Sequence, residues 1–556
     1  MNKKVCSFPI LFALLALLIG TCAVVFPASA QVAPTSTGSI TVSGTVASSY
    51  DAYQIFSANV VDGDSDAKIA TDLAWASDAA RDAVLPVLHS AGMPKSQTTA
   101  REAAEWLNTD SYLTSALSAQ LARSLQSSGA VSVALNAGTA AELPCGYWLI
   151  VADDDAIAQN EAGTAPIMAL VGGSAVTVKP KAATPKVAKH VLEDGTAAWQ
   201  KAADATVADD LYWRLSATVP AGLTAYDTYT VRFVDTMGAG LDPSKVAASM
   251  RVYVAAGADG GFDAVSAGKD GRVGTESAKG WTDITAQCAT KVAADGKTFT
   301  VRTGDLIAAL GGADAFTAGA RVVAVYNAPL NGACNHGIAK GNPNEVYLRY
   351  PRSPFADQSG DAGFTRTPSD DACAYTWDLA LTKRGSDGDK PLAGAVLSIA
   401  DDRGRTLAAD GTWDAEGKAT VTTGKDGRVT VSGVDSGKLE VRELKAPKGY
   451  TAFEGTRSAT VKAEGLDVDQ VAAAKPKLTI TAESPLRADS ADGSTGSLEA
   501  SLINTPTGTP PSITTGGFMP STGDMAMYAA AAAAVAGAAL IVVALLVKRG
   551  GGSHKE

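Results

Sequence analysis

The pattern of apolar and polar positions divides the chain into a mixed first part and a longer part built of strands. In the first part, residues 31–181, Thr99 followed three residues later by Glu102 predicts a capping box at the start of a helix. The elements predicted there are strands at 38–46 and 147–151 and helices through 105–107 and over 111–125. We therefore expect a mixed α/β domain at this end.

Short alternating segments, separated by Gly, Asp and Pro turns, fill residues 182–354 and 375–505. This pattern is typical of β-sandwiches. Between them, the Ser-, Asp- and Gly-rich residues 355–374 predict a linker, and the Pro-, Thr- and Gly-rich residues 506–518 predict an extended spacer. The expected fold is therefore mainly β, with tandem immunoglobulin-like β-sandwiches after the mixed domain.

The first thirty residues have the pattern of a secretory signal. A short basic region is followed by an apolar run from Phe8 to Phe26 and by the small residues Ala28, Ser29 and Ala30. This order predicts an exported chain that is cut after Ala30. The alternative is a membrane anchor that stays in place.

The other end, residues 519–556, contains a second apolar run from Met525 to Val547, followed by Lys548 and Arg549. Its length suits a transmembrane helix, and the basic pair would keep the tail on the cytoplasmic side. Directly before it stand five residues that resemble the sortase sorting signal Leu-Pro-x-Thr-Gly: Met519, Pro520, Ser521, Thr522 and Gly523. The resemblance implies a temporary membrane anchor and then attachment to the cell wall. A permanent anchor is the alternative, and Met519 in place of Leu leaves the sortase class open.

The charge and the cysteines limit the partners and the bonds that we expect. The formal net charge of −11 argues against nucleic acid as a partner. Cys145, Cys288, Cys334 and Cys373 remain after the signal segment, and their pairing stays open because four cysteines allow three connectivities. Cysteine is sparse, so the domains need large cores or another covalent device.

No pattern predicts a metal, a cofactor or the turnover of an external substrate. None of the four histidines has a paired zinc spacing, and Asp62, Asp64 and Asp66 lack the glycine and the final glutamate of an EF-hand. Cys334 and His336 could form a nucleophile pair, but they lie in a Gly- and Asn-rich loop where a structural role fits better. We therefore expect a protein that is not an enzyme.

Each predicted sandwich places one lysine, one acid and one asparagine on an apolar strand face, because residues i and i+2 of a strand share a face. These residues are Lys189, Asp235 and Asn344 in the first sandwich, and Lys383, Glu443 and Asn504 in the second. Burying a charge is costly unless it is paired or neutralised. An ordinary buried ion pair beside an asparagine is the alternative, but the recurrence of the trio favours a shared chemistry.

That chemistry is an internal cross-link. Burial pushes a lysine amine toward its neutral, nucleophilic form and a carboxyl toward its protonated form. The acid can then polarise the asparagine carbonyl, and attack by the amine gives a Lys–Asn isopeptide bond and ammonia. The predicted bond ties the first strand of each sandwich to the last.

The sequence around the first trio resembles the fimbrial isopeptide-forming domain of Gram-positive major pilins. The matching residues are 178–181, 184–189, 234–237, 240–241, 326–328 and 341–344. The resemblance implies that Lys189 and Asn344 are the cross-linked pair and that Asp235 is the catalytic acid. Asn327 also alternates with apolar neighbours, so it stays an alternative to Asn344.

The segment from Leu439 to Tyr450 resembles the E-box of pilins, Tyr-x-Leu-x-Glu-Thr-x-Ala-Pro-x-Gly-Tyr. It keeps the Glu, Ala-Pro and Gly-Tyr of that motif, and it places the domain with the collagen-adhesin B-type, prealbumin-like domains. The resemblance implies that Glu443 is the acid for the bond between Lys383 and Asn504.

Together these resemblances imply the backbone subunit of a sortase-assembled pilus, with a sortase, other pilin subunits and peptidoglycan as partners. The intersubunit lysine would be Lys181, which matches the last position of the pilin motif Val-Tyr-Pro-Lys, although Lys179 replaces its Tyr. Lys179 and Lys186 are competing lysines. The alternative is a monomeric wall-anchored adhesin or minor pilin that binds a host-surface ligand.

Overall fold

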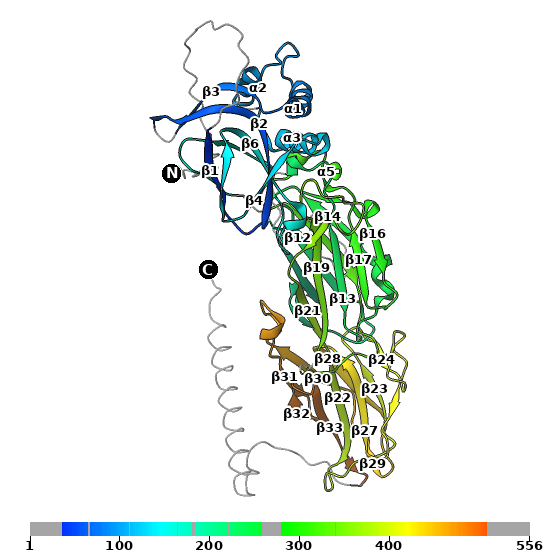
Figure 1. Cartoon of the computed structure of the whole chain (residues 1–556). Coiled ribbons are helices and arrows are strands. Elements are labelled where there is room, and N and C mark those ends of the chain that lie inside the picture. Colours follow the sequence, from blue (N-terminus) through cyan, green and yellow to red (C-terminus); the bar gives the residue numbers. More distant parts are fainter. Residues whose placement is uncertain are drawn as a thin grey trace, which may run out of the picture.

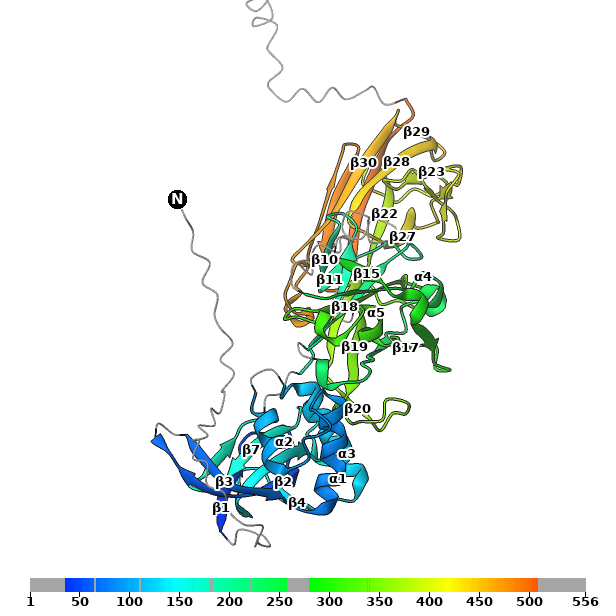
Figure 2. The same ribbon diagram turned by 90° about the horizontal axis from the view of Figure 1, so that it is seen from above.

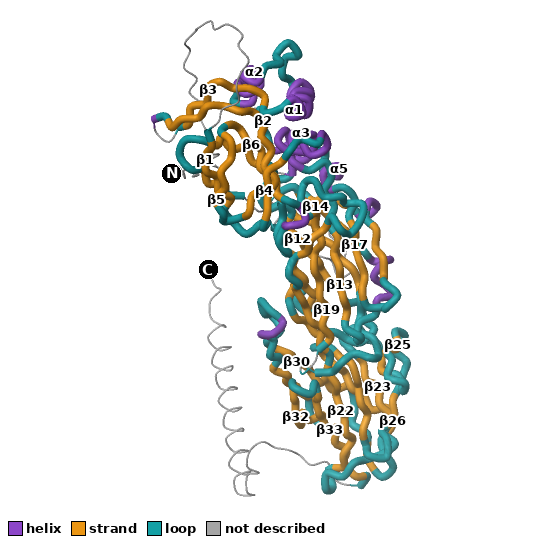
Figure 3. Tube along the Cα trace, viewed as in Figure 1, coloured by secondary structure: helices purple, strands orange, loops and turns teal. Residues whose placement is uncertain are grey.

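The computed structural model describes residues 36–508 except for gaps at 65–66, 110–111, 164, 181–183, 221–222, 258–279, 338 and 340. In this part three units follow one another along an elongated molecule (Figure 1 and Figure 2). Strands dominate, and helices gather in the first unit (Figure 3). The expected fold class, mainly β with a mixed α/β domain at the N-terminal side, is confirmed.

Several features expected near the two ends fall outside the described residues. They are the signal segment 1–30, most of the spacer 506–518, the sorting residues with the apolar run behind them, 519–556, and Lys181. Among the residues that the structure does describe, no helix is both long enough and apolar enough to span a bilayer.

The first unit combines two sheets with a layer of helices. One sheet has the order β3-β2-β6-β7 with β4 on β2, and the other has the order β5-β1-β8. The strands are β1 (Thr37–Val42), β2 (Ser49–Asp62), β3 (Lys68–Trp75), β4 (Ser132–Asn136), β5 (Ala140–Pro144), β6 (Gly146–Ala152), β7 (Ile167–Val171) and β8 (Val176–Val178). The helices are α1 (Asp78–Ser90), α2 (Ala100–Leu107) and α3 (Ser115–Ser128). Their buried residues Val84 and Leu121 pack on Ile55 and Leu149 of the sheet.

The helix starts follow from side-chain caps. Thr99 and Glu102 form the predicted capping box of α2. The Thr114 hydroxyl accepts a hydrogen bond from the Leu117 N–H, so α3 begins at Ser115 rather than at the expected residue 111. Sequence reasoning missed α1, whose cap, Ser77, was a recognisable signal.

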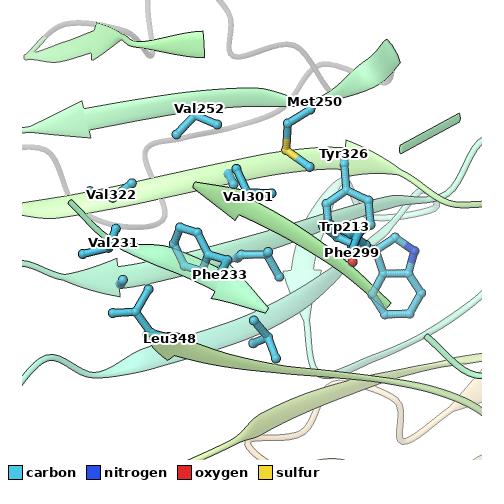
Figure 4. Close-up of a cluster of buried hydrophobic side chains, with 14 of the residues drawn as sticks. Trp213, Val231, Phe233, Met250, Val252, Phe299, Val301, Val322, Tyr326 and Leu348 are labelled. Carbon is cyan, nitrogen blue, oxygen red and sulfur yellow. The ribbon is translucent and has the colours of Figure 1, made fainter. Parts of the chain in front are cut away.

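The second unit is a β-sandwich. One sheet has the order β10-β9-β12-β18-β14-β15, and the other has the order β11-β21-β19-β13-β17-β16 with β20 on β19. The first sheet contains β9 (Val187–Glu193), β10 (Ala198–Gln200), β12 (Tyr212–Thr218), β14 (Arg251–Ala255), β15 (Trp281–Asp283) and β18 (Arg321–Asn327). The second contains β11 (Ala202–Asp204), β13 (Arg232–Met237), β16 (Ala289–Val292), β17 (Thr298–Arg302), β19 (Asn342–Pro351), β20 (Phe364–Arg366) and β21 (Asp370–Tyr375), and the short helices are α4 (Val246–Ser249) and α5 (Leu306–Ala309). Trp213, Phe233, Phe299 and Leu348 fill the core between the sheets (Figure 4).

The expected linker 355–374 differs from what the structure shows. Its later part forms β20 and β21, which both pair with β19. Phe364, Cys373 and Ala374 are buried, because these strands complete a sheet of the second unit. Within this range, residues 355–363 and 367–369 lie outside the sandwich strands, and the polar residues Asp370 and Asp371 belong to β21.

The third unit is a second sandwich. Its sheets have the orders β27-β22-β33-β29, with β32 on β33, and β25-β24-β23-β28-β30-β31, with β26 on β23. The first sheet contains β22 (Trp377–Gly385), β27 (Arg428–Val434), β29 (Tyr450–Thr451), β32 (Leu486–Asp492) and β33 (Ser497–Pro506). The second contains β23 (Val396–Ala400), β24 (Thr406–Leu407), β25 (Trp413–Asp414), β26 (Val421–Thr422), β28 (Gly437–Lys445), β30 (Thr456–Glu464) and β31 (Lys477–Ala482). Its first and last strands, β22 and β33, are parallel neighbours.

Polar contacts join the second unit to the third. The Asp204 carboxylate of β11 accepts hydrogen bonds from the Trp377 indole N–H at 2.6 Å and from the Ser436 backbone N–H at 2.9 Å. Arg405 of the third unit forms two hydrogen bonds with the Asp209 carboxylate. Hydrogen-bonded charges in fixed geometry favour one orientation of the two sandwiches.

Candidate functional site

The structure buries all six side chains of the two predicted trios. Lys189, Asp235, Asn344 and Lys383 are 0% exposed, Asn504 is 2% exposed and Glu443 is 6% exposed. Each lies on a strand among apolar neighbours, as strand alternation predicts. Each trio gathers at one place inside its sandwich.

In the second unit, the lysine comes from one sheet and its two partners come from the other. Lys189 lies on β9, where Leu215 of β12 is its register partner. Asp235 on β13 and Asn344 on β19 belong to neighbouring strands, since Asp235 is opposite Val346 and Asn344 is opposite Met237. A bond between Lys189 and Asn344 would therefore join the two sheets.

A tyrosine hydroxyl stands at the centre of this cluster. The Lys189 ammonium forms an ion pair with Asp235 Oδ2 and donates to the Tyr326 hydroxyl at 2.9 Å. The Tyr326 hydroxyl donates to Asp235 Oδ2 at 3.0 Å, and the Asn344 amide Nδ2 donates to the same hydroxyl at 2.8 Å. Sequence reasoning did not assign this tyrosine a role, although it shares an inward face of β18 with Val322 and Ala324.

Burial changes the acid–base properties of the pair. Removal from water lowers the pKa of Lys189 to about 8, against the opposing effect of Asp235. Burial also raises the pKa of Asp235 above its usual range, although Lys189 opposes that shift. Both shifts favour the neutral amine and the protonated carboxyl more than water does.

Two buried oxygen atoms in this cluster, Asp235 Oδ1 and Asn344 Oδ1, accept no hydrogen bond from any described residue. An unsatisfied buried acceptor is costly. A proton on the carboxyl of Asp235 would supply the missing donor for such an acceptor. The alternative asparagine, Asn327, is already satisfied elsewhere: its Oδ1 accepts from the Leu211 N–H at 3.1 Å and its Nδ2 donates to Asp210 at 2.6 Å.

In the third unit the sheets contribute the residues differently. Lys383 on β22 and Asn504 on β33 belong to neighbouring parallel strands, where Asn504 is opposite Gly385. Glu443 comes from β28 of the facing sheet. A bond between Lys383 and Asn504 would therefore join two strands of one sheet, with the acid above them.

The contacts of this second cluster are direct. Lys383 Nζ donates to Asn504 Oδ1 at 2.5 Å and to the Leu502 carbonyl at 3.1 Å. Asn504 Nδ2 donates to Glu443 Oε1 at 2.8 Å, and the same oxygen is 3.7 Å from Lys383 Nζ. Burial lowers the pKa of Lys383 to about 8, although Glu443 opposes the shift. The amine therefore sits directly against the amide that it would attack.

The remaining candidate residues are the cysteines and the histidine beside one of them. The four cysteines Cys145, Cys288, Cys334 and Cys373 are free thiols in the described structure. Cys334 Sγ is 3.6 Å from His336 Nε2, but burial raises the pKa of this thiol. The other ring nitrogen of His336, Nδ1, is 2.7 Å from Asp378 Oδ1 of the third unit, so the ring joins the two units. In the described part of the chain, no group of three or more His, Cys, Asp or Glu residues could hold a metal ion.

Lysines near the end of the first unit are exposed. Val178 at the end of β8 is buried, and Lys179 and Lys186 are exposed on either side of the undescribed residues 181–183. Lys181 itself, the predicted intersubunit lysine, lies outside the described residues.

Two comparisons with known proteins match parts of the chain. Residues 378–475 match the family model described as SpaA: Prealbumin-like fold domain. Over 143 residues the chain is 31% identical to the trypsin-resistant surface T6 protein of Streptococcus pyogenes serotype M6, and this match spans 24% of each chain, about a quarter of the relative's length.

Similar solved structures include a backbone pilin and a major pilin. The T6 backbone pilin of serotype M6 Streptococcus pyogenes is 17% identical, with a TM-score of 0.46, over 85% of this chain and 98% of that chain. The major pilin SpaD from Corynebacterium diphtheriae is 15% identical, with a TM-score of 0.41, over 85% and 98% of the two chains. From the family match and the curated relative, the chain is similar over part of its length to a streptococcal surface protein, and its last sandwich is similar to the prealbumin-like domains.

Proposed function

We propose that this chain is the structural backbone subunit of a covalent, sortase-polymerised surface pilus, and that each of its two sandwiches closes an internal Lys–Asn isopeptide bond. The observation that carries the proposal is the recurrence of one buried cluster of a lysine, an acid and an asparagine in two tandem sandwiches. The partial identity of the chain to a surface protein and the similarity of its last unit to prealbumin-like domains support the same function.

The reaction in the second unit starts from the neutral Lys189 amine. Its Nζ attacks Cγ of Asn344 while protonated Asp235 donates to the Asn344 carbonyl oxygen, which stabilises the charge that develops there. The new N–C bond forms, the bond from Cγ to Nδ2 breaks, and Nδ2 leaves as ammonia. No oxidant or cofactor is required, and the reaction occurs once in each molecule.

The third unit follows the same course with a different arrangement. Lys383 Nζ attacks Cγ of Asn504, and Glu443 lies close to both nitrogen atoms that change their bonds. The carboxyl can therefore take a proton from the amine and deliver one to the leaving nitrogen. The chain would act on itself in both units and on no external substrate.

The two bonds would reinforce the fibre in different ways. The bond in the second unit would tie one sheet to the other, and the bond in the third would tie the first strand to the last. By analogy with disulfides, each contributes about 2–5 kcal/mol to stability. When the fibre is pulled, the covalent bond in each sandwich would then limit how far that sandwich can unfold.

Polymerisation would use the two ends of the subunit. A sortase would cut between Thr522 and Gly523 and hold Thr522 as an acyl group, which Lys181 of the next subunit would attack. Peptidoglycan would receive the last acyl group and anchor the fibre to the wall.

The test of polymerisation is a ladder of high-mass species that resists SDS in cell-wall extracts. Lys181→Ala should abolish the ladder and leave a wall-anchored monomer, and Lys179→Ala should leave the ladder intact. A ladder that persists without Lys181 would assign the link to another lysine. A wild-type chain without any ladder would support the monomeric adhesin or minor pilin instead.

A further inference from the structure

The Tyr326 hydroxyl contacts both nitrogen atoms that take part in the proposed bond exchange at Asn344 Cγ in the second unit. It is 2.9 Å from Lys189 Nζ, which would attack, and 2.8 Å from Asn344 Nδ2, which would leave. The trio of lysine, acid and asparagine does not include this group. Tyr326 is therefore a fourth polar group of this cluster.

The core holds this hydroxyl in place. Tyr326 is 0% exposed, and its ring meets the ring of Phe299 edge-on, with the centroids 4.8 Å apart. Trp213 lies beside it in the same core (Figure 4). The ring has little freedom to turn away, so the hydroxyl stays beside both nitrogen atoms.

The cross-linking reaction requires a proton to move between these nitrogens. When the amine attacks, Nζ gains a positive charge and must lose a proton. Nδ2 must gain a proton before it can leave as ammonia rather than as an amide anion. The cluster is closed to solvent, so a protein group has to carry that proton.

We propose that Tyr326 is a catalytic residue that relays this proton, an inference that rests on the proposed cross-link. Its hydroxyl gives its own proton to Nδ2 and receives one from Nζ, so the phenol is unchanged at the end. The lysine loses one proton, ammonia carries it away, and the new amide bond joins Lys189 to Asn344. No other reactant is needed.

The acid contacts different groups in the two clusters, and this difference accounts for a relay in the second unit alone. In the third unit, Glu443 Oε1 reaches both nitrogens, at 2.8 Å from Asn504 Nδ2 and 3.7 Å from Lys383 Nζ. In the second unit, Asp235 Oδ2 contacts Lys189 Nζ and the Tyr326 hydroxyl, and that hydroxyl is the group that contacts Asn344 Nδ2. The shorter aspartate and the tyrosine together span the distance that glutamate spans alone.

Burial also keeps the phenol in the form that a relay needs. It raises the pKa of Tyr326 well above the usual range, so the hydroxyl remains protonated and can donate as it accepts. Asp235 and Lys189 are the charged groups that contact it.

The test is Tyr326→Phe, which removes only the hydroxyl. The full chain would be made by cell-free synthesis, and peptide mass mapping over time would follow each of the two bonds separately. Because general acid–base catalysis typically contributes 10²–10⁴-fold, we expect the bond between Lys189 and Asn344 to form at least roughly 100-fold more slowly. The bond in the third unit should form at the wild-type rate.

Tyr350→Phe is the matched control, since Tyr350 is equally buried in the same core but its hydroxyl donates to the Glu161 carbonyl at 3.3 Å. It should leave both bonds at the wild-type rate. A Tyr326→Phe chain that closes its second-unit bond as fast as wild type would overturn the relay alone. A wild-type chain that never forms that bond would overturn the proposed function.

A fluorinated tyrosine placed at position 326 provides a second measurement that does not depend on how Tyr326→Phe folds. It keeps the hydroxyl and the packing but lowers the phenol pKa. If Tyr326 relays the proton, the rate of bond formation should change in the second unit only. An unchanged rate would show that the hydroxyl merely fills space, and it would overturn the relay.

Discussion

Lys189 and Asp235 meet across the interior of the second sandwich, one from each sheet, and both side chains are fully buried. Lys383 and Glu443 repeat this relationship in the third unit, also from opposite sheets. The position of the asparagine differs: it lies on the sheet of the acid in the second unit and on the sheet of the lysine in the third. The same three groups therefore meet through two different strand arrangements.

The first prediction concerns the mass of the intact protein. The wild-type chain should be lighter than its sequence mass by two ammonia molecules, one for each bond. Asp235→Asn should restore one of them and Glu443→Gln the other, because an amide cannot supply the acid proton. Intact-mass spectrometry measures this directly.

Asp361→Asn is the control for these variants, since Asp361 pairs with Arg232 and Arg349 at the surface of the same unit. It should keep the wild-type mass. A wild-type mass equal to that of the plain sequence would refute both cross-links.

The second prediction concerns stability. Asn344→Ala removes the electrophile of the second unit, and we expect the free energy of unfolding to fall by about 2–5 kcal/mol from loss of the cross-link. Thermal unfolding followed by circular dichroism would report the change. Reductant should leave the wild-type transition unmoved, because the described cysteines are free thiols. A transition that dithiothreitol lowers would indicate a disulfide instead.

The third prediction is a bell-shaped pH dependence for bond formation in the second unit. The reactive state holds one proton on the pair, as neutral Lys189 beside protonated Asp235. Above a pH of about 8, the lowered pKa of Lys189, the pair loses that proton and the rate should fall. At low pH the pair holds two protons, the amine is charged, and the rate should also fall.

The acid limb of this profile should lie above the usual carboxyl range, because burial raises the pKa of Asp235. Peptide mapping after synthesis at a series of pH values would trace both limbs. A rate that keeps rising well above pH 8 would contradict the requirement for a protonated acid.

The fourth prediction concerns export and anchoring. Thr522→Ala removes the residue that would form the acyl group with the sortase. We expect the variant to stay in the membrane fraction or to enter the medium instead of attaching to the wall. Fractionation and immunoblotting would locate it, and Ser521→Ala, at the variable position of the motif, should attach normally. Wall attachment of the Thr522→Ala chain would refute the sorting assignment.

The sequence alone was sufficient for the mainly β fold class, for the start of α2 and for the burial of the six candidate side chains. Side chains alternate across a strand, so Lys189 had to share a face with Val187 and Val191 wherever the strand lay. The capping box at Thr99 and Glu102 is equally local, because both of its hydrogen bonds lie within one helical turn.

Tertiary structure decided how those residues combine. Alternation placed both Asn327 and Asn344 beside apolar neighbours. The packing of β9 against β19 brings Asn344 to the cluster of Lys189, whereas Asn327 on β18 bonds to Asp210. Residues 364–366 and 370–375, whose polar surroundings predicted a linker, form strands that pair with β19.

Tyr326 could be recognised only once the sheets were assembled. Its hydroxyl joins Lys189, which is 137 residues away in sequence, to Asp235 and Asn344 on the facing sheet. Periodicity along a strand determines which face a side chain occupies, and it contains no information about which distant strand lies opposite. That choice depends on how the two sheets bury their apolar faces together, so the chemistry of the site was settled by packing rather than by local pattern.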